Sequence, residues 1–166
     1  MVADWTWDEC LLCQFYDFDS TKLRECLENG ANVNSVDNYG RTGLYWAAED
    51  GDLPVVRLLL EYGANPNIYC TAHKMTPLYW ACRNDHTDVV LELLNNGADP
   101  NIADASNQTG LYWASHNGNI KIVKMLLDHG AFTNIIDNYG YTALYWAISN
   151  QFEDIRLMLM DYSESE

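Results

Sequence analysis

Apolar residues in this chain gather in short clusters with helical spacing, and polar or glycine-containing breaks separate the clusters. The runs at 55–60 and 89–94 are rich in valine and leucine, and each is followed by a glycine, Gly63 or Gly97. Such a run predicts a buried helix that stops at the glycine. A second kind of cluster, Leu-Tyr-Trp-Ala, precedes each run across a polar break such as 49–52. The pattern therefore predicts pairs of short helices.

These clusters recur with a fixed period. The word Leu-Tyr-Trp-Ala returns in steps of 34, 33 and 33 residues, beginning at Leu44, Leu78, Leu111 and Leu144. The pair Gly-Ala marks the same period in steps of 33, 34 and 33 residues, from Gly30 to Gly130. Two independent markers with one period of this length indicate a solenoid of stacked units.

Each period also carries signals for where its helices start. A threonine precedes each Leu-Tyr-Trp-Ala helix and can cap it, at Thr42, Thr76, Thr109 and Thr142. Pro77 suits a first helical position. After each glycine stop comes a stretch rich in asparagine and glycine, such as 134–140, which predicts a hairpin-like loop.

These residues resemble the ankyrin repeat, whose pattern is Asp-x-x-Gly-x-Thr-Pro-Leu-His-x-Ala, a second helix, and then Gly-Ala-Asp-x-Asn. The resemblance implies an all-α solenoid of about five stacked helix-turn-helix units joined by β-hairpin-like loops, with degenerate capping repeats at the ends. It implies one domain, 1–162, followed by a short acidic tail, 163–166. The expected units are a capping repeat at about 5–34 and repeats at about 37–67, 70–101, 104–134 and 137–162.

Two departures from the family pattern predict local differences. Tyrosine stands where the family has histidine, and its hydroxyl is expected to replace the bond that this histidine makes between neighbouring repeats. Lys74 and Asn107 stand where Gly40 and Gly140 keep the turn glycine. Lysine adopts a left-handed conformation at a cost, and the loop 69–75 also contains one extra residue. An altered hairpin is therefore expected there.

The two ends of the chain are expected to cap the stack, because a solenoid exposes its core at both termini unless the outer units turn polar. Arg156 replaces a valine that the earlier units have at this position, which predicts a polar change at the last unit. Thr6 and Glu9 form a candidate capping box for the first helix. The residues expected to face the core of the first unit are Leu11, Leu12, Phe15, Leu23 and Leu27.

Composition and charge narrow the choice of partner and compartment. The 166 residues include 24 acidic and 9 basic side chains, a formal net charge of −15. Such a charge repels phosphate backbones and anionic lipids, so nucleic acid and membranes are not expected partners. The sequence contains no run long enough to span a membrane and no basic leader, and its five cysteines form no regular framework. We expect an intracellular monomer, in the cytoplasm or also in the nucleus.

No catalytic or cofactor motif is present, so the sequence predicts neither an enzyme nor a bound cofactor. Cys10 and Cys13 are spaced to share a helix face and, with Cys26, offer three of the four ligands of a zinc site. The simpler interpretation is that Cys26 fills the core of the first unit and that Cys10 and Cys13 partly cover this unit. We favour packing over a metal, and a thiol-responsive or metal-responsive scaffold remains the least favoured function.

Two further features each allow two interpretations. The repeated tyrosines and tryptophans form columns that either fill the space between repeats or stack against a ligand, and packing is the favoured interpretation. The acidic residues either keep the protein soluble or attract a basic partner. Glu49 and Asp50 favour the second interpretation, because the aligned positions of later repeats carry no acid.

The resemblance implies a non-catalytic scaffold, an adaptor or inhibitor, that binds another protein on its concave face and hairpin tips. The acidic charge favours a partner with a basic surface. The alternative is the client-recognition module of a larger assembly or effector, such as a ligase or a host-targeting protein. The anchors are expected to be Tyr39, Met75, Tyr139 and Tyr141, unless the tip tyrosines pack against neighbouring hairpins. The full partner-binding set carried over from the family is Val36, Asn38, Tyr39, Arg41, Glu49, Asp50, His73, Met75, Arg83, Asn84, Ala103, Ala105, Ser106, Gln108, His116, Asn117, Ile136, Asn138, Tyr139, Tyr141, Ser149 and Asn150.

Overall fold

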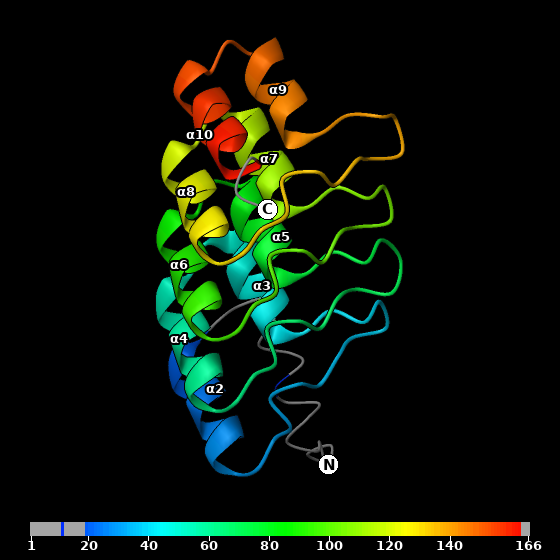
Figure 1. The fold of residues 1–166 in the computed structure, drawn as a ribbon. Helices are drawn as coiled ribbons and strands as arrows, with labels where there is room; N and C mark the ends of the chain where they lie inside the picture. The colour runs from blue at the N-terminus through cyan, green and yellow to red at the C-terminus, as the bar shows by residue number, and fades with distance from the viewer. Residues whose placement is uncertain (1–10, 12–18, 164–166) are drawn as a thin grey trace.

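Short helices pair and stack along one axis in the computed structural model, which describes residue 11 and residues 19–163 (Figure 1). The first helix of each pair lies in an inner layer and the second in an outer layer, and long loops project from the inner side. The inner helices are α3 (Gly43–Asp50), α5 (Pro77–Arg83), α7 (Gly110–Asn117) and α9 (Ala143–Ser149). The outer helices are α2 (Ser20–Glu28), α4 (Leu53–Glu61), α6 (Thr87–Asn95), α8 (Ile120–Asp128) and α10 (Glu153–Ser163).

Each inner helix packs against the inner helix of the next unit and against the outer helix of its own unit. This contact order is that of a solenoid, in which a unit is stabilised by its immediate neighbours. The predicted helix pairs and the predicted all-α repeat architecture are therefore confirmed.

The four threonines cap the inner helices as the sequence predicts. The hydroxyl of Thr42 accepts a hydrogen bond from the backbone N–H of Tyr45 at 3.1 Å. Thr76, Thr109 and Thr142 make the same bond to the tyrosine three residues later, at 3.1, 3.4 and 3.2 Å. Each bond satisfies a backbone donor that a helix start would otherwise leave without a partner.

The projecting loops are narrow hairpins fixed by a carboxylate at their base. Val36 and Thr42 form an isolated antiparallel bridge, and one oxygen of Asp37 accepts the backbone N–H groups of Tyr39 and Arg41 at 2.8 and 3.0 Å. Asp104 and Asp137 bind their own loops in the same way. The sequence predicts the hairpins, and the structure adds the carboxylate that holds each of these three.

The hairpin of the second full repeat is different, as the extra residue predicts. Cys70 stands at the position of the carboxylate, and Lys74 is left-handed with a φ of 57°. The backbone N–H of Lys74 bonds to the carbonyl of Cys70 four residues back, whereas Gly40 bonds to Asp37 three residues back. This loop is therefore one residue longer and has no side-chain carboxylate to fix it.

A column of leucines from the outer helices forms the centre of the core. Leu23 and Leu27 of α2 are buried, as predicted, and so are Cys26 and Leu11. Deep burial of these side chains is the main source of cohesion between units. The candidate capping box at Thr6 and Glu9, and the core positions Leu12 and Phe15, lie outside the described residues.

The last unit is polar at one of the positions where a further unit would pack. Arg156 forms an ion pair with Glu153 at 2.6 Å, in agreement with the predicted polar change. However, Tyr145 and Ile148 are 42% and 54% exposed, whereas their counterparts Tyr112 and Ser115 are buried. The C-terminal end of the stack therefore combines one charged substitution with exposed apolar side chains.

Candidate protein-binding surface

We call the surface formed by α3, α5, α7, α9 and the hairpin loops the inner face (Figure 1). Every residue of the predicted partner-binding set lies on these elements or at their ends. The exposed members are Val36, Asn38, Tyr39, Asp50, His73, Asn84, Ala105, Ile136, Asn138, Tyr139, Ser149 and Asn150. The half-buried members are Arg41, Glu49, Met75, Arg83, Ala103, Ser106, Gln108, His116, Asn117 and Tyr141.

A continuous series of aromatic rings runs along the inner helices. Tyr79 of α5 lies edge-on to Trp80 of its own repeat and to Trp113 of the next, with ring centres 5.7 and 6.2 Å apart. Tyr45 and Tyr112 bridge their own repeat and the next in the same way. Edge-to-face contacts of this kind are favourable beyond the area that they bury.

The tyrosines and tryptophans of this series differ in burial. Tyr45, Tyr79 and Tyr112 are buried, which confirms that they pack between repeats. The tryptophan row, defined as Trp46, Trp80, Trp113 and Trp146, is half-buried. The tyrosines therefore join the repeats, and the tryptophan row forms part of the accessible inner face.

Cations and a histidine cover the rings of the tryptophan row. The guanidinium carbon of Arg83 lies 5.0 Å from the ring centre of Trp80 and 4.6 Å from that of Trp113. The ring of His116 lies between Trp113 and Trp146, at 5.6 and 4.7 Å. The Arg83 contacts hold a positive group against the negative faces of two indoles.

Arg41 and Arg83 differ in whether a carboxylate pairs with their charge. Arg41 lies 4.1 Å from the ring centre of Trp46, and it also forms an ion pair with Asp37 at 2.7 Å. Arg83 has no carboxylate within ion-pair distance in the described part of the chain. The charge of Arg41 is therefore neutralised within its own hairpin, whereas the half-buried Arg83 presents its charge on the inner face.

The hydroxyls of Tyr79 and Tyr112 connect their repeats to the next hairpin, as the sequence predicts. The hydroxyl of Tyr79 faces the Asp104 carboxylate, and burial together with this carboxylate raises the pKa of Tyr79 to about 12. Tyr112 faces Asp137 in the same way. For Tyr45, the next hairpin has Cys70 in place of this aspartate. The connection between the first and second full repeats therefore lacks a carboxylate.

The pKa of Asp137 shows how its hairpin is stabilised. Burial alone would raise this pKa, but hydrogen bonds from the backbone N–H groups of Tyr141 and Tyr139, and from Gln108 and Tyr112, lower it overall. Hydrogen bonds that favour the charged form of a carboxyl lower its pKa. Asp137 is therefore a charged group that the folded structure stabilises.

Glu49 and Asp50 form an acidic site at the end of α3. Burial raises the pKa of Glu49, and the adjacent charge of Asp50 raises it further. The charges of Arg41 and Arg83 oppose this increase. A partially desolvated carboxylate beside a second one is stabilised by an additional cation.

Asparagines at the ends of the inner helices tie neighbouring repeats together. The side-chain amide of Asn84 donates to the carbonyl of Glu49 at 2.8 Å. Asn117 and Asn150 donate to the carbonyls of Arg83 and His116, each at 2.9 Å. Sequence reasoning assigned these asparagines to the partner and missed this bond, although their recurrence at the repeat period was a usable signal.

The hairpin tips present the most exposed aromatic side chains of the predicted set. Tyr39 is 59% exposed and Tyr139 is 75% exposed. Tyr39 lies beside Arg41 of its own hairpin, with 4.6 Å between the ring centre and the guanidinium carbon. Tyr141 stacks on Tyr145 at 4.2 Å. Tyr139 therefore projects furthest into solvent, whereas Tyr39 and Tyr141 are held by contacts within their own repeats.

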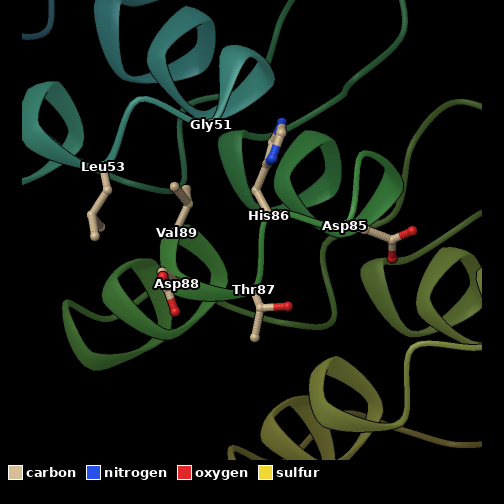
Figure 2. Close-up of a pocket in the computed structure, with 7 residues that line it drawn as sticks. All are labelled: Gly51, Leu53, Asp85, His86, Thr87, Asp88 and Val89. Atoms are coloured by element: carbon tan, nitrogen blue, oxygen red, sulfur yellow. The ribbon is translucent and has the colours of Figure 1, made fainter.

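A pocket of about 330 Å³ lies between the helix turns of two consecutive repeats (Figure 2). His86 points from the start of α6 toward the turn at Gly51, and its Nε2 lies 3.0 Å from the carbonyl oxygen of Glu49. A similar pocket at the turns of the last two repeats involves Gly118 and Phe152. Because the pocket recurs at equivalent positions, it is a property of the stack.

The described residues offer no cluster of three or more metal-ligating side chains. Cys70 and Cys82 are free and buried, Cys26 is buried, and burial raises the pKa of the Cys82 thiol. Cys10 and Cys13 of the zinc hypothesis lie outside the described residues. None of the helices that the structure describes is long and apolar enough to span a bilayer.

Comparison with known proteins identifies a repeat family. A family model described as ankyrin repeats, in three copies, matches residues 11–104 and again 100–166. An ankyrin repeat protein of fowlpox virus is 42% identical over 59 residues, which are 36% of this chain and 8% of the viral protein. Osteoclast-stimulating factor 1 of Xenopus laevis is 52% identical over 46 residues, 28% of this chain and 20% of that protein.

The DNA-binding protein RFXANK of Homo sapiens is 48% identical over 48 residues, 28% of this chain and 18% of that protein. The chain therefore matches less than a quarter of the length of each of these three relatives. The similarity lies in the repeats.

Proposed function

The chain belongs to the ankyrin repeat family, whose members generally mediate protein–protein interaction, and we propose that it is a non-catalytic adaptor or inhibitor that holds a partner protein on its inner face. The observation that carries this proposal is the placement of two exposed tyrosines, Tyr39 and Tyr139, on hairpins that flank the half-buried tryptophan row. Aromatic side chains supply large contact areas at low conformational cost, and they are enriched at energetically important interface positions. We take the inner face as the counterpart of the concave binding side that the resemblance implies.

We propose a partner with a basic surface. The formal net charge of −15 attracts such a surface over long range. Glu49 and Asp50 supply a local acidic site on the inner face, and Glu49 gains from an added cation because burial raises its pKa. Electrostatic attraction of this kind increases the rate of association and depends on salt.

The same net charge supports a monomer, because copies of the chain repel one another. The buried free thiols of Cys70 and Cys82 support an intracellular, reducing location in the cytoplasm or nucleus. Both statements extend the proposal and rest on charge and cysteine chemistry.

A second candidate function is the client-recognition module of a larger assembly. The relatives favour it, because the matched segments form 8% to 20% of those proteins. In that case the inner face selects the client and another part of the assembly acts on it.

The test is a pull-down from lysate of the source cells at low and high salt. The binding variant changes Tyr39, Glu49, Asp50 and Tyr139 to alanine, and the matched control changes the exposed outer-layer residues Glu25, Glu28, Leu91 and Leu157 to alanine. We expect a basic protein that the parent and the control capture, that the binding variant loses, and that high salt weakens. Capture by the binding variant equal to that of the parent would overturn the inner face as the binding site.

A further inference from the structure

Arg83 is a cation that the fold holds in a fixed position on the inner face. Two indole rings, those of Trp80 and Trp113, contact its guanidinium group, and the group is half-buried. Asn117 bonds to its backbone carbonyl and so fixes the end of α5 from which the side chain extends. A guanidinium is planar, and one held in place by two rings presents its N–H donors in a fork that matches a carboxylate.

Arg83 has no carboxylate partner in the described part of the chain, in contrast to three other arginines. Arg41 pairs with Asp37, Arg57 with Glu92 and Arg156 with Glu153. Glu49 attracts Arg83 but does not come within ion-pair distance of it. The chain has 24 acidic residues, yet none of those that the structure describes lies within ion-pair distance of Arg83.

The acidic site lies one repeat before Arg83, at the end of the neighbouring inner helix. Glu49 occupies the position in α3 that Arg83 occupies in α5, and Asp50 follows it. Asp50 also stands where Asn84, Asn117 and Asn150 donate to the preceding repeat, a bond that a carboxylate is unable to donate. The inner face therefore carries negative charge at one repeat and positive charge at the next.

The separation of these charges suits an extended peptide. Packed helices lie about 8–10 Å apart, and an extended chain rises about 3.3 Å per residue, so one repeat corresponds to about three residues of a partner. The geometry points to an extended partner segment that carries a basic side chain against Glu49 and Asp50 and, about three residues away, an acidic side chain against Arg83. This inference rests on the proposed function and adds the charge pattern of the bound segment.

The two ends of the segment are recognised by different physical means. The basic side chain lies beside the carboxylates of Glu49 and Asp50 and reduces the repulsion between them. The acidic side chain meets a guanidinium already positioned by two indoles, so less conformational entropy is lost on binding than with a free arginine. A segment with two basic side chains would place one of them against Arg83, which disfavours binding.

The probe is a displayed library of random peptides, selected in parallel on three immobilised proteins. These are the parent, an Arg83→Glu variant, and a control with Arg57→Glu in the outer layer. An Arg83→Gln variant serves in place of Arg83→Glu if the latter fails to give the parent's circular dichroism spectrum and melting temperature. Binding of a selected peptide is then measured on Tyr39→Ala/Tyr139→Ala protein to show that it occupies the inner face.

We expect peptides from the parent and from the Arg57→Glu control to share a basic and an acidic residue about three positions apart. Peptides from Arg83→Glu should replace the acidic residue with a basic one. A parent-selected peptide should lose at least about tenfold in affinity on Arg83→Glu or Arg83→Gln, consistent with the removal of one charge pair at an interface.

The outcomes separate the inference from the proposed function. Peptides that depend on Tyr39 and Tyr139 but share no charge pair, or that bind Arg83→Glu as well as the parent, would overturn the inference and leave the inner-face proposal standing. If the library yields no peptide that depends on Tyr39 and Tyr139, both proposals are overturned.

Discussion

The side-chain amide of Asn117 donates a hydrogen bond to the backbone carbonyl of Arg83, 2.9 Å away, and so ties α7 to the end of α5. The same bond recurs one repeat earlier and one repeat later, at Asn84 and Asn150. The asparagine column is therefore part of the joint between repeats, and its exposure does not make it free for a partner.

Asn117→Ala should lower the free energy of unfolding by about 1 kcal/mol, because the carbonyl of Arg83 and the carboxylate of Asp85 lose this donor. Urea unfolding followed by circular dichroism measures the change. Asn95→Ala is the matched control, since this asparagine also ends a helix and makes no side-chain hydrogen bond within the described chain. Equal stability of the two variants would mean that the bond adds nothing.

Trp113→Ala should cost about 3 kcal/mol, the low end for a buried tryptophan, because the ring is half-buried. The variant loses edge contacts to Tyr79 and Tyr112 and the contact with Arg83. Thermal unfolding of this variant is compared with that of Tyr139→Ala, whose exposed ring should change stability by less than about 0.5 kcal/mol. An unchanged melting temperature for Trp113→Ala would show that the tryptophan row has no structural role.

Lys74→Gly should stabilise the protein by about 0.5 to 1 kcal/mol, because Lys74 is held at a φ of 57° that lysine adopts at a cost. The same substitution at Lys124, inside α8, should destabilise by about 1 kcal/mol, since glycine weakens a helix interior. The opposite signs follow from the backbone alone and are measured in the same urea titration. Destabilisation by Lys74→Gly would contradict the strain assigned to this hairpin.

Glu49→Gln should stabilise the protein near neutral pH. Burial and the charge of Asp50 raise the folded pKa of Glu49 above its unfolded value of about 4.3. The parent therefore loses stability as pH rises from about 4.3 through the folded pKa, whereas the glutamine variant does not. Unfolding curves measured across this range should show the two proteins converging at acid pH. A variant that is less stable than the parent at neutral pH would refute the prediction.

Asp137→Asn should show the opposite pH dependence. Burial opposes its charge, but the bonds from Tyr141, Tyr139, Gln108 and Tyr112 lower its pKa in the folded protein. The charged form therefore adds stability that is present above the unfolded pKa of about 3.9 and is lost as pH falls through the folded pKa. We expect the variant to be about 1 kcal/mol less stable at neutral pH, with the difference closing in acid. A constant difference over that range would assign the loss to packing.

The sequence predicts those parts of the structure that depend on local signals. Thr42 caps α3, Gly63 follows the end of α4 with a positive φ, and the extra residue near Lys74 alters its hairpin. Each of these features is predictable because it involves only residues that are close in sequence. The contacts of Arg83 with Trp113 and of Asn117 with Arg83 join residues more than thirty positions apart. Their geometry depends on how one repeat is seated on the next, which the residue pattern does not specify.

The same distinction applies to the candidate binding surface. The family pattern placed the predicted residues on the inner face, and their separation into exposed and half-buried groups came from packing. Arg41 and Arg83 appeared equivalent as sequence positions on that face. The structure distinguishes them, because Asp37 neutralises one and no described carboxylate neutralises the other.

The hairpin that follows Tyr45 has Cys70 where the later hairpins have an aspartate, and this difference has a mechanical consequence. The repeats are joined in series, so bending of the molecule accumulates at the joint with the lowest stiffness. The joints at Asp104 and Asp137 each have a tyrosine hydroxyl facing a carboxylate, and the joint at Cys70 does not. We therefore expect the curvature of the stack to adjust most easily between α3 and α5. This joint lies next to Glu49, Asp50 and Arg83, which are proposed to bind the two charges of the partner segment.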